Sequence, residues 1–185
     1  MNALTQTHPP FTSAEFYRMA AKGAFGDMRV ELRRGVILKM SPQHYPHARL
    51  KADLQRALER AIVAAGLNWE VLTEATVSFA DGFEPMPDIV VIEQAMMPNK
   101  FGTIPAAAVK VVVEVADSTL ADDMGDKRED YANAGLAEYW VADLQAKAVI
   151  RHASPKDGSH LNQAPPIPLA QPIALLTQPQ IVAKA

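Results

Sequence analysis

The spacing of hydrophobic residues along the chain indicates a mixture of helices and strands. Over 46–65, apolar side chains recur every three to four residues, which is the period of a helix with one buried face. A second helix is expected over 122–134, where acidic residues crowd the first turns and Gly135 follows. A third, short helix should follow Thr12, because Thr12 and Glu15 have the spacing of a capping box.

Strands are predicted where apolar and polar residues alternate or where β-branched residues run together. The runs 87–92 and 109–115 are short and rich in valine and isoleucine, which is typical of strands buried on both faces in the middle of a sheet. The other predicted strands are the two arms of a hairpin within 29–41, turning at Arg34-Gly35, and the segments 69–79, 138–143 and 148–152. A loop rich in proline, methionine and asparagine is expected over 93–105.

The length of 185 residues is that of one domain. Residues 1–152 contain the predicted helices and strands. Residues 153–185 hold six of the fourteen prolines, so they are expected to form an extended tail of the same domain, draped on its body or lying at a sheet edge. Helices and strands therefore mix around one central sheet, which is an α/β or α+β fold.

Composition excludes several classes of protein. The chain has no cysteine, which excludes disulfides, thiolate zinc sites and cysteine nucleophiles. It lacks the glycine-rich loop of P-loop and dinucleotide-binding proteins. No apolar run approaches the roughly 18 residues that a membrane helix needs, and the polar N-terminus does not resemble a signal peptide. A cytoplasmic protein without a membrane partner is therefore expected.

The net charge of −3 hides an uneven distribution. Residues 1–60 carry ten Lys and Arg against five Asp and Glu, whereas residues 61–185 carry eight against sixteen. Such a contrast can mark a partner surface or a metal site. It predicts a basic surface on the hairpin and the long helix, beside an acidic metal pocket.

Two carboxylates in the central strands are the first candidates for chemistry. Asp88 begins one apolar strand, and Glu114 interrupts the valines between Val111 and Val115. A carboxylate buried there without a partner costs several kcal/mol. If the two strands are neighbours, Asp88 and Glu114 converge and offer the oxygen ligands that Mg²⁺ prefers. The alternative is that Glu114 points outward at a sheet edge, on the same face as Lys110.

A lysine on the next helix has the spacing to reach these carboxylates. Asp123, Lys127 and Tyr131 are four residues apart in turn, so they share one helix face. An ammonium group delivered over a metal site would stabilise developing negative charge or hold an attacking water. The alternative is an ordinary ion pair between Asp123 and Lys127 on a solvated helix.

Pro87-Asp88 and Glu114-Val115, whose acids lie 26 positions apart, resemble the PD-(D/E)xK nuclease motif. More specifically, the chain resembles the Uma family, bacterial proteins described as restriction endonucleases, over residues 12–152. The stretches that carry this resemblance are Glu31 to Gly35, Met40-Ser41-Pro42 leading to His47, Pro87 to Val90, Val113 to Thr119, Asp123 to Lys127 with Tyr131, and Ala134 to Trp140.

The resemblance implies a restriction-endonuclease-like fold, with a central mixed sheet flanked by helices. It implies Asp88 and Glu114 as ligands of Mg²⁺ or Mn²⁺, with the Val115 carbonyl as a third ligand. The chain departs from the simple motif, because Ala116 stands where the motif has its lysine. The resemblance implies that Lys127, on the following helix, takes that role.

Glu31 and His47 also match family positions, and the resemblance implies that both line the site. For His47 the alternative is a helix cap or a surface residue, and for Glu31 an ordinary residue beside a turn. Glu74 is a weaker candidate, and Tyr131 is expected to support Lys127 by packing or hydrogen bonding.

The first functional hypothesis is a Mg²⁺-dependent endonuclease that hydrolyses DNA phosphodiester bonds. In it, basic residues of the first half would meet the DNA backbone: Arg33, Arg34, Arg49, Lys51, Arg56 and Arg60. The last four lie on the outer faces of the long helix, and the alternative for them is an ordinary solvated face. The alternative is a catalytically inactive binding or structural module, with the acids in structural roles. A third option is a metal-dependent hydrolase of a smaller phosphate ester. A homodimer is compatible with both the endonuclease and the inactive-module hypothesis.

Overall fold

The computed structural model describes residues 10–98 and 102–184; the start of the N-terminal segment and the middle of the predicted loop 93–105 lie outside the described residues. The elements are α1 Ser13–Ala21, β1 Val30–Arg33, β2 Val36–Lys39, α2 Tyr45–Ala64, β3 Trp69–Thr73, β4 Val77–Ser78, β5 Ile89–Glu93, η1 Gln94–Met96, β6 Ile104–Pro105, η2 Ala106–Ala108, β7 Val109–Ala116, α3 Leu120–Met124, α4 Asp126–Asn133, β8 Glu138–Asp143, β9 Ala148–Lys156, β10 Ser159–Pro168, β11 Ile173–Ala174 and β12 Val182–Ala183.

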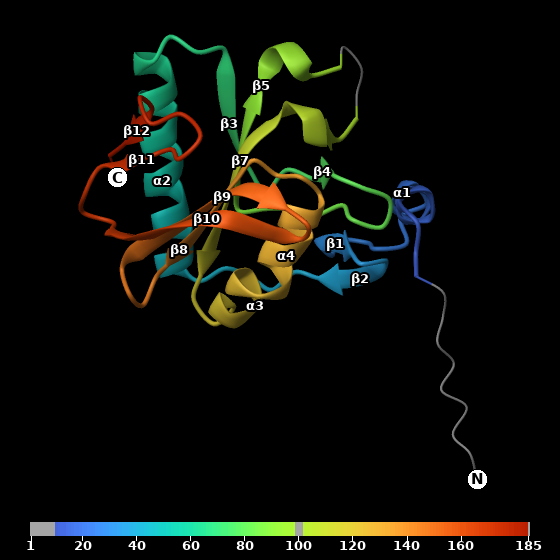
Figure 1. Ribbon diagram of the computed structural model, residues 1–185. Coiled ribbons are helices and arrows are strands. Elements are labelled where there is room, and N and C mark those ends of the chain that lie inside the picture. The colour runs from blue at the N-terminus through green and yellow to red at the C-terminus, as the bar shows by residue number, and fades with distance from the viewer. Residues whose placement is uncertain (1–9, 99–101, 185) are drawn as a thin grey trace.

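A six-stranded sheet in the order β10-β9-β8-β7-β5-β3 forms the centre of the molecule (Figure 1). Within this sheet, β7 and β8 pair in parallel and the other neighbours are antiparallel. The parallel pair is joined through α3 and α4, since parallel strands need a crossover. The predicted mixed sheet with flanking helices is therefore confirmed, and β5 and β7 are neighbours near its middle.

Each face of the sheet packs against a different layer. One face meets α2 and the short β11–β12 pair, with Val111, Val113 and Val115 of β7 in that core. The other face meets α4, with Val112 and Ala116 of β7 in a second core. Figure 1 shows α2 and α4 on opposite sides of the sheet. Alternate residues of β7 thus face opposite layers, as the two-residue period of a strand requires.

The local signals at the N-terminal end of the chain are confirmed. Thr12 and Glu15 form the predicted capping box of α1. The hairpin β1–β2 turns at Arg34 and Gly35, which both have a positive φ, as the tightest hairpin turns require. A Cβ on Gly35 would also collide with Pro10, so a close approach of the chain depends on this glycine.

Two predicted elements are broken in the structure. The single strand over 69–79 is instead β3 and β4, separated at Glu74, whose φ of 55° ends the extended conformation. The single helix over 122–134 is instead α3 and α4, separated at Gly125, where φ is −106° and ψ is −109°. A Cβ on Gly125 would lie 2.7 Å from the Ala121 carbonyl oxygen, so the kink favours a glycine.

The proline-rich tail is an integral part of the sheet. Its predicted place at a sheet edge is confirmed, since β10 pairs with β9 and is the outermost strand. Residues beyond β10, among them Ile173, Leu175 and Ile181, are buried in the core beside α2. None of the helices within the described ranges is both long enough and apolar enough to cross a membrane.

Candidate active site

Glu114 lies on the face of β7 that α4 covers. It falls between Val112 and Ala116, both in the second core, and its exposed fraction is 4%. The alternative in which it points outward beside Lys110 is wrong. Lys110 lies near the opposite end of β7, where its Nζ is 2.6 Å from Glu93 Oε2.

Asp88 meets Glu114 at the end of the β5–β7 pair. Ile89 pairs with Val113 in antiparallel register, which brings Asp88 level with Glu114. The backbone N–H of Asp88 donates to Glu114 Oε2 over 3.3 Å, and the N–H of Val115 donates to Asp88 Oδ2 over 2.9 Å. The predicted convergence of the two carboxylates is therefore confirmed.

The following helix delivers two more side chains to Glu114. Lys127 Nζ lies 3.1 Å from Glu114 Oε1 and 3.6 Å from Asp123 Oδ1. The Tyr131 hydroxyl donates to the same Glu114 Oε1 over 3.0 Å. Tyr131 was expected to support Lys127, and its hydroxyl instead hydrogen-bonds the Glu114 carboxylate. Despite the break at Gly125, Asp123 and Lys127 still share one side of the crossover.

Asp88 is also held by side chains from the start of α2 and the residues just before it. His47 Nε2 lies 3.1 Å from Asp88 Oδ2, and Gln43 Nε2 donates to Asp88 Oδ1 over 2.9 Å. Lys51 Nζ lies 3.9 Å from Asp88 Oδ1. Sequence reasoning missed Gln43 and placed Lys51 on an outer face of its helix. The four-residue spacing of Gln43, His47 and Lys51 was the available signal.

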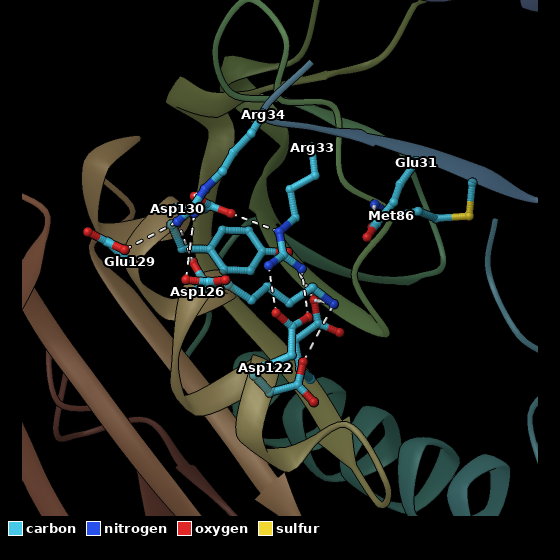
Figure 2. A network of polar contacts seen from close by, with 12 residues as sticks. Glu31, Arg33, Arg34, Met86, Asp122, Asp126, Glu129 and Asp130 are labelled. Atoms are coloured by element: carbon cyan, nitrogen blue, oxygen red, sulfur yellow. Dashed lines mark hydrogen bonds and ion pairs between the residues drawn. The ribbon is translucent and has the colours of Figure 1, made fainter. Parts of the chain in front are cut away.

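Glu31 lines the same cavity as Asp88 and Glu114, whereas Glu74 does not. Glu31 Oε2 accepts the backbone N–H of Met86 over 3.3 Å, a neighbourhood that Figure 2 shows at the edge of the hairpin. Glu74 instead pairs with Lys51, at 2.5 Å, and with Arg29, at 3.1 Å. All five predicted site residues line one cavity of about 370 Å³: Asp88, Glu114, Lys127, Glu31 and His47.

The site carries more carboxylate charge than its cations neutralise. Burial raises the pKa of Glu114 to about 8, Lys127 opposes the rise, and Asp88 adds to it. Burial likewise raises the pKa of Asp123 against the opposing effect of Lys127. Burial alone would lower the pKa of Lys127, but Glu114 and Glu31 outweigh it and raise the pKa. Lys127 therefore keeps its charge beside carboxylates whose pKa values are raised.

Asp88 differs from Glu114 in the sign of its shift. Burial raises the pKa of Asp88, but the hydrogen bond from His47 and the N–H of Val115 outweigh burial and lower it. The same hydrogen bond to Asp88 raises the pKa of His47. The pKa values of the two strand carboxylates thus shift in opposite directions, that of Asp88 down and that of Glu114 up.

The donor set fits a hard divalent cation. Within the described residues, no three His, Cys, Asp or Glu side chains gather closely enough to hold a metal by themselves. Two neighbouring carboxylates remain, Asp88 and Glu114, beside a cavity. Mg²⁺ is commonly held by one or two carboxylates and keeps several waters.

Comparison with known proteins identifies the family. The family model described as "Putative restriction endonuclease", Uma2, matches residues 13–181. The chain belongs to the Uma2 family. The match extends beyond the stretches that carried the resemblance and includes most of the proline-rich tail, in keeping with its place in the sheet. No curated protein matches the chain.

One solved structure shares the fold of this Uma2 member. It is the crystal structure of a putative nuclease belonging to DUF820 from Anabaena variabilis ATCC 29413, with a TM-score of 0.65 and 14% identity, covering 84% of this chain and 83% of that chain. The fold is thus restriction-endonuclease-like. The apo form of E. coli MS115-1 NucC aligns over 66% of this chain and 56% of that chain, at 20% identity and a TM-score of 0.28.

The predicted basic surface is largely neutralised in this Uma2 member. Arg33 and Arg34 pair with acids of α3 and α4, as Figure 2 shows. On α2, Arg49 and Arg56 share Asp53. Lys51 holds Glu74, and Arg60 donates to the carbonyl of Lys184. The predicted basic surface is therefore compensated, through local pairs on α2 and through contacts between segments far apart in the sequence elsewhere.

Proposed function

We propose that this chain is a Mg²⁺- or Mn²⁺-dependent endonuclease that hydrolyses phosphodiester bonds in DNA. The observation that carries the proposal is the meeting of Asp88, Glu114 and Lys127, from three separate elements, at one cavity. Membership of a family described as restriction endonucleases supports the nuclease class. In this proposal the lysine of the PD-(D/E)xK motif has moved to the helix after the strand.

The cation would be held by Asp88 and Glu114, with the Val115 carbonyl as a third ligand. A bound divalent cation lowers the pKa of a coordinated water and offsets the charge of the scissile phosphate. The excess of buried carboxylate charge around Glu114 supports this assignment. His47 and Gln43 act as positioning residues, since both hold the Asp88 carboxylate in place.

Lys127 supplies the positive charge that belongs to the chain itself. Lys127 lines the cavity, and its Nζ keeps its proton because Glu114 and Glu31 raise its pKa above the effect of burial. An ammonium group there donates to a phosphate oxygen or holds the attacking water, and charge stabilisation of this kind is a large term in catalysis. Tyr131 fixes Glu114 Oε1 between its hydroxyl and Lys127.

Plasmid cleavage in Mg²⁺ or Mn²⁺ tests the proposal. Lys127→Met and Glu114→Gln should each reduce the cleavage rate at least about 100-fold, the usual cost of removing one electrostatic group from a site. Lys110→Met is the matched control, because Lys110 forms a similar ion pair with Glu93 near the other end of β7. Cleavage that survives both site substitutions would overturn the assignment.

The remaining hypotheses correspond to distinct results of the same assay. A folded wild-type protein that binds DNA and cleaves none with either cation would indicate the inactive binding module. Hydrolysis of bis(p-nitrophenyl) phosphate without DNA cleavage would indicate a hydrolase of smaller esters. Sedimentation of the wild-type protein tests the predicted homodimer independently of these outcomes.

A further inference from the structure

The hairpin presents an arginine to the mouth of the cavity. Arg33 lines the cavity, and its side chain is only 10% exposed. Its Nε donates to Asp130 Oδ2 over 2.8 Å. Its two terminal nitrogens donate to the two oxygens of Asp122, each over 2.6 Å (Figure 2). Arg33 is the one member of the six basic residues above that lines this cavity.

The two carboxylates that hold Arg33 differ in how firmly they are fixed. Asp130 is 8% exposed and also accepts from Arg34 Nε over 2.5 Å, so it is anchored from two sides. The side chain of Asp122 is 45% exposed and lies on α3, a helix of five residues that ends at Gly125. An exposed carboxylate can exchange its partner for water at little cost. Asp130 therefore keeps the guanidinium oriented even when Asp122 turns away.

A phosphate could take the place of the Asp122 carboxylate in its two hydrogen bonds with Arg33. A guanidinium fork makes two parallel hydrogen bonds to a carboxylate or to the two non-bridging oxygens of a phosphodiester. Since Arg33 borders the cavity that holds Asp88 and Lys127, a backbone phosphate adjacent to the reacting one would reach it. A single acidic residue then competes with the substrate for the same two donors.

We propose that Arg33 binds a backbone phosphate of the nucleic acid, and that Asp122 occupies this position until the substrate displaces it. The choice of a nucleic acid as ligand rests on the proposed function. Asp122 is then an internal competitor that weakens binding, and its removal should tighten binding. Asp130 is a positioning residue that keeps the donors of Arg33 directed at the cavity.

Equilibrium binding of a short DNA duplex in EDTA and low salt tests this inference. Asp122→Ala should tighten binding at least about fivefold. Glu129→Ala is the matched control, because it also removes one exposed carboxylate from an arginine, here Arg34 at 3.2 Å, but lies outside the cavity lining. The control should stay within twofold of wild type. Equal tightening in both variants would show that the effect comes from the change in net charge alone, which would overturn the inference.

The salt dependence of binding adds a second criterion. One additional phosphate contact steepens the slope of log K against log salt by about 0.9. The substrate displaces Asp122 in wild type too, so Asp122→Ala and Asp122→Ser should tighten binding without changing this slope. Adding Arg33→Gln to Asp122→Ala removes the contact and should make the slope shallower by about 0.9. Tightening that persists in the double variant contradicts the inference, as does a wild-type affinity in both single variants.

The binding assay separates this inference from the nuclease proposal. It contains no divalent cation and needs no cleavage. Selective tightening in Asp122→Ala with no cleavage in Mg²⁺ or Mn²⁺ would support the phosphate site while the nuclease proposal fails. Cleavage by wild type, together with identical DNA binding by Asp122→Ala and Glu129→Ala, would support the nuclease proposal and overturn the phosphate site.

Discussion

Two glutamates in adjacent parallel strands are both buried, and their surroundings differ. Glu114 on β7 faces α4, whereas Glu138 on β8 lies on the same side of the sheet as Trp140, facing the C-terminal tail. Glu138 is fully buried and accepts four hydrogen bonds, from Trp140 Nε1 at 2.6 Å, Leu176 N at 2.7 Å, Thr177 N at 2.8 Å and Thr177 Oγ1 at 2.7 Å.

Glu114 has fewer donors and more carboxylate neighbours. It accepts from Tyr131 and the N–H of Asp88, and pairs with Lys127. Burial and the charge of Asp88 outweigh Lys127 and raise its pKa to about 8. A buried carboxylate saturated by donors ties segments together, while one crowded by other carboxylates is a candidate for chemistry. Burial by itself does not separate the two cases; the partners do.

The largest expected effect is the loss of the saturated glutamate. Glu138→Ala should lower the free energy of unfolding by roughly 4 kcal/mol, since each buried donor left without a partner costs about 1–3 kcal/mol. Urea unfolding measures it. Glu70→Ala, on β3, is the control, because Glu70 is exposed and makes one bond to Gln94. Equal losses in both variants would remove the structural role assigned to Glu138.

A buried group without partners extends the comparison to β9. His152 is fully buried, and within the described residues neither ring nitrogen has a hydrogen-bond partner. Burial, with nearby Arg128 and His160, lowers its pKa from 6.5 to about 4. The Tyr139 ring also stacks near it, with centroids 6.1 Å apart.

Because the His152 ring binds its second proton more tightly in the unfolded chain than in the folded protein, stability should fall as the pH drops from about 6.5 to 4. The loss amounts to about 3 kcal/mol at most. Urea unfolding at pH 7 and pH 4.5 measures it, and His152→Phe should flatten the difference. A slope identical to that of wild type in His152→Phe would show that His152 does not titrate in this range.

Neutral isosteres test the two glutamates directly. Glu138→Gln replaces an oxygen that accepts with an amide group that donates, so it should cost roughly 2 kcal/mol. Glu114→Gln, unfolded in EDTA, should change stability by less than about 1 kcal/mol, because it removes a charge that its neighbours disfavour. If the Glu114 variant loses as much as the Glu138 variant, the contrast between them fails.

The smallest expected effect is stabilisation by the cation. Mg²⁺ at about ten times its dissociation constant should add roughly 1 kcal/mol, or about 2–4 °C in Tm for a chain of this size. Thermal unfolding with and without EDTA measures the shift. Asp88→Asn should abolish it, while Glu70→Ala should retain it. A shift of equal size in the Asp88 variant would place the bound cation elsewhere.

Much of the site was predictable because its two strand carboxylates follow local patterns. Asp88 and Glu114 stand out as acids in runs of β-branched residues, and such runs pair in the middle of a sheet. Lys127 follows at a helical spacing that survives the kink at Gly125. The kink itself and the break at Glu74 were not predictable, since each depends on a backbone conformation that no hydrophobic period records.

By itself, the sequence determined the central strands, the long helix, the capping box and the carboxylates that the strands carry. These follow from short-range spacing, which acts before the chain is packed. Only the tertiary structure decided which charges meet. The pairing of Arg33 with Asp122 joins residues 89 positions apart, and Glu138 reaches the tail across 38 and 39 positions. Side-chain hydrogen bonds over such separations exist only once burial has brought the segments together.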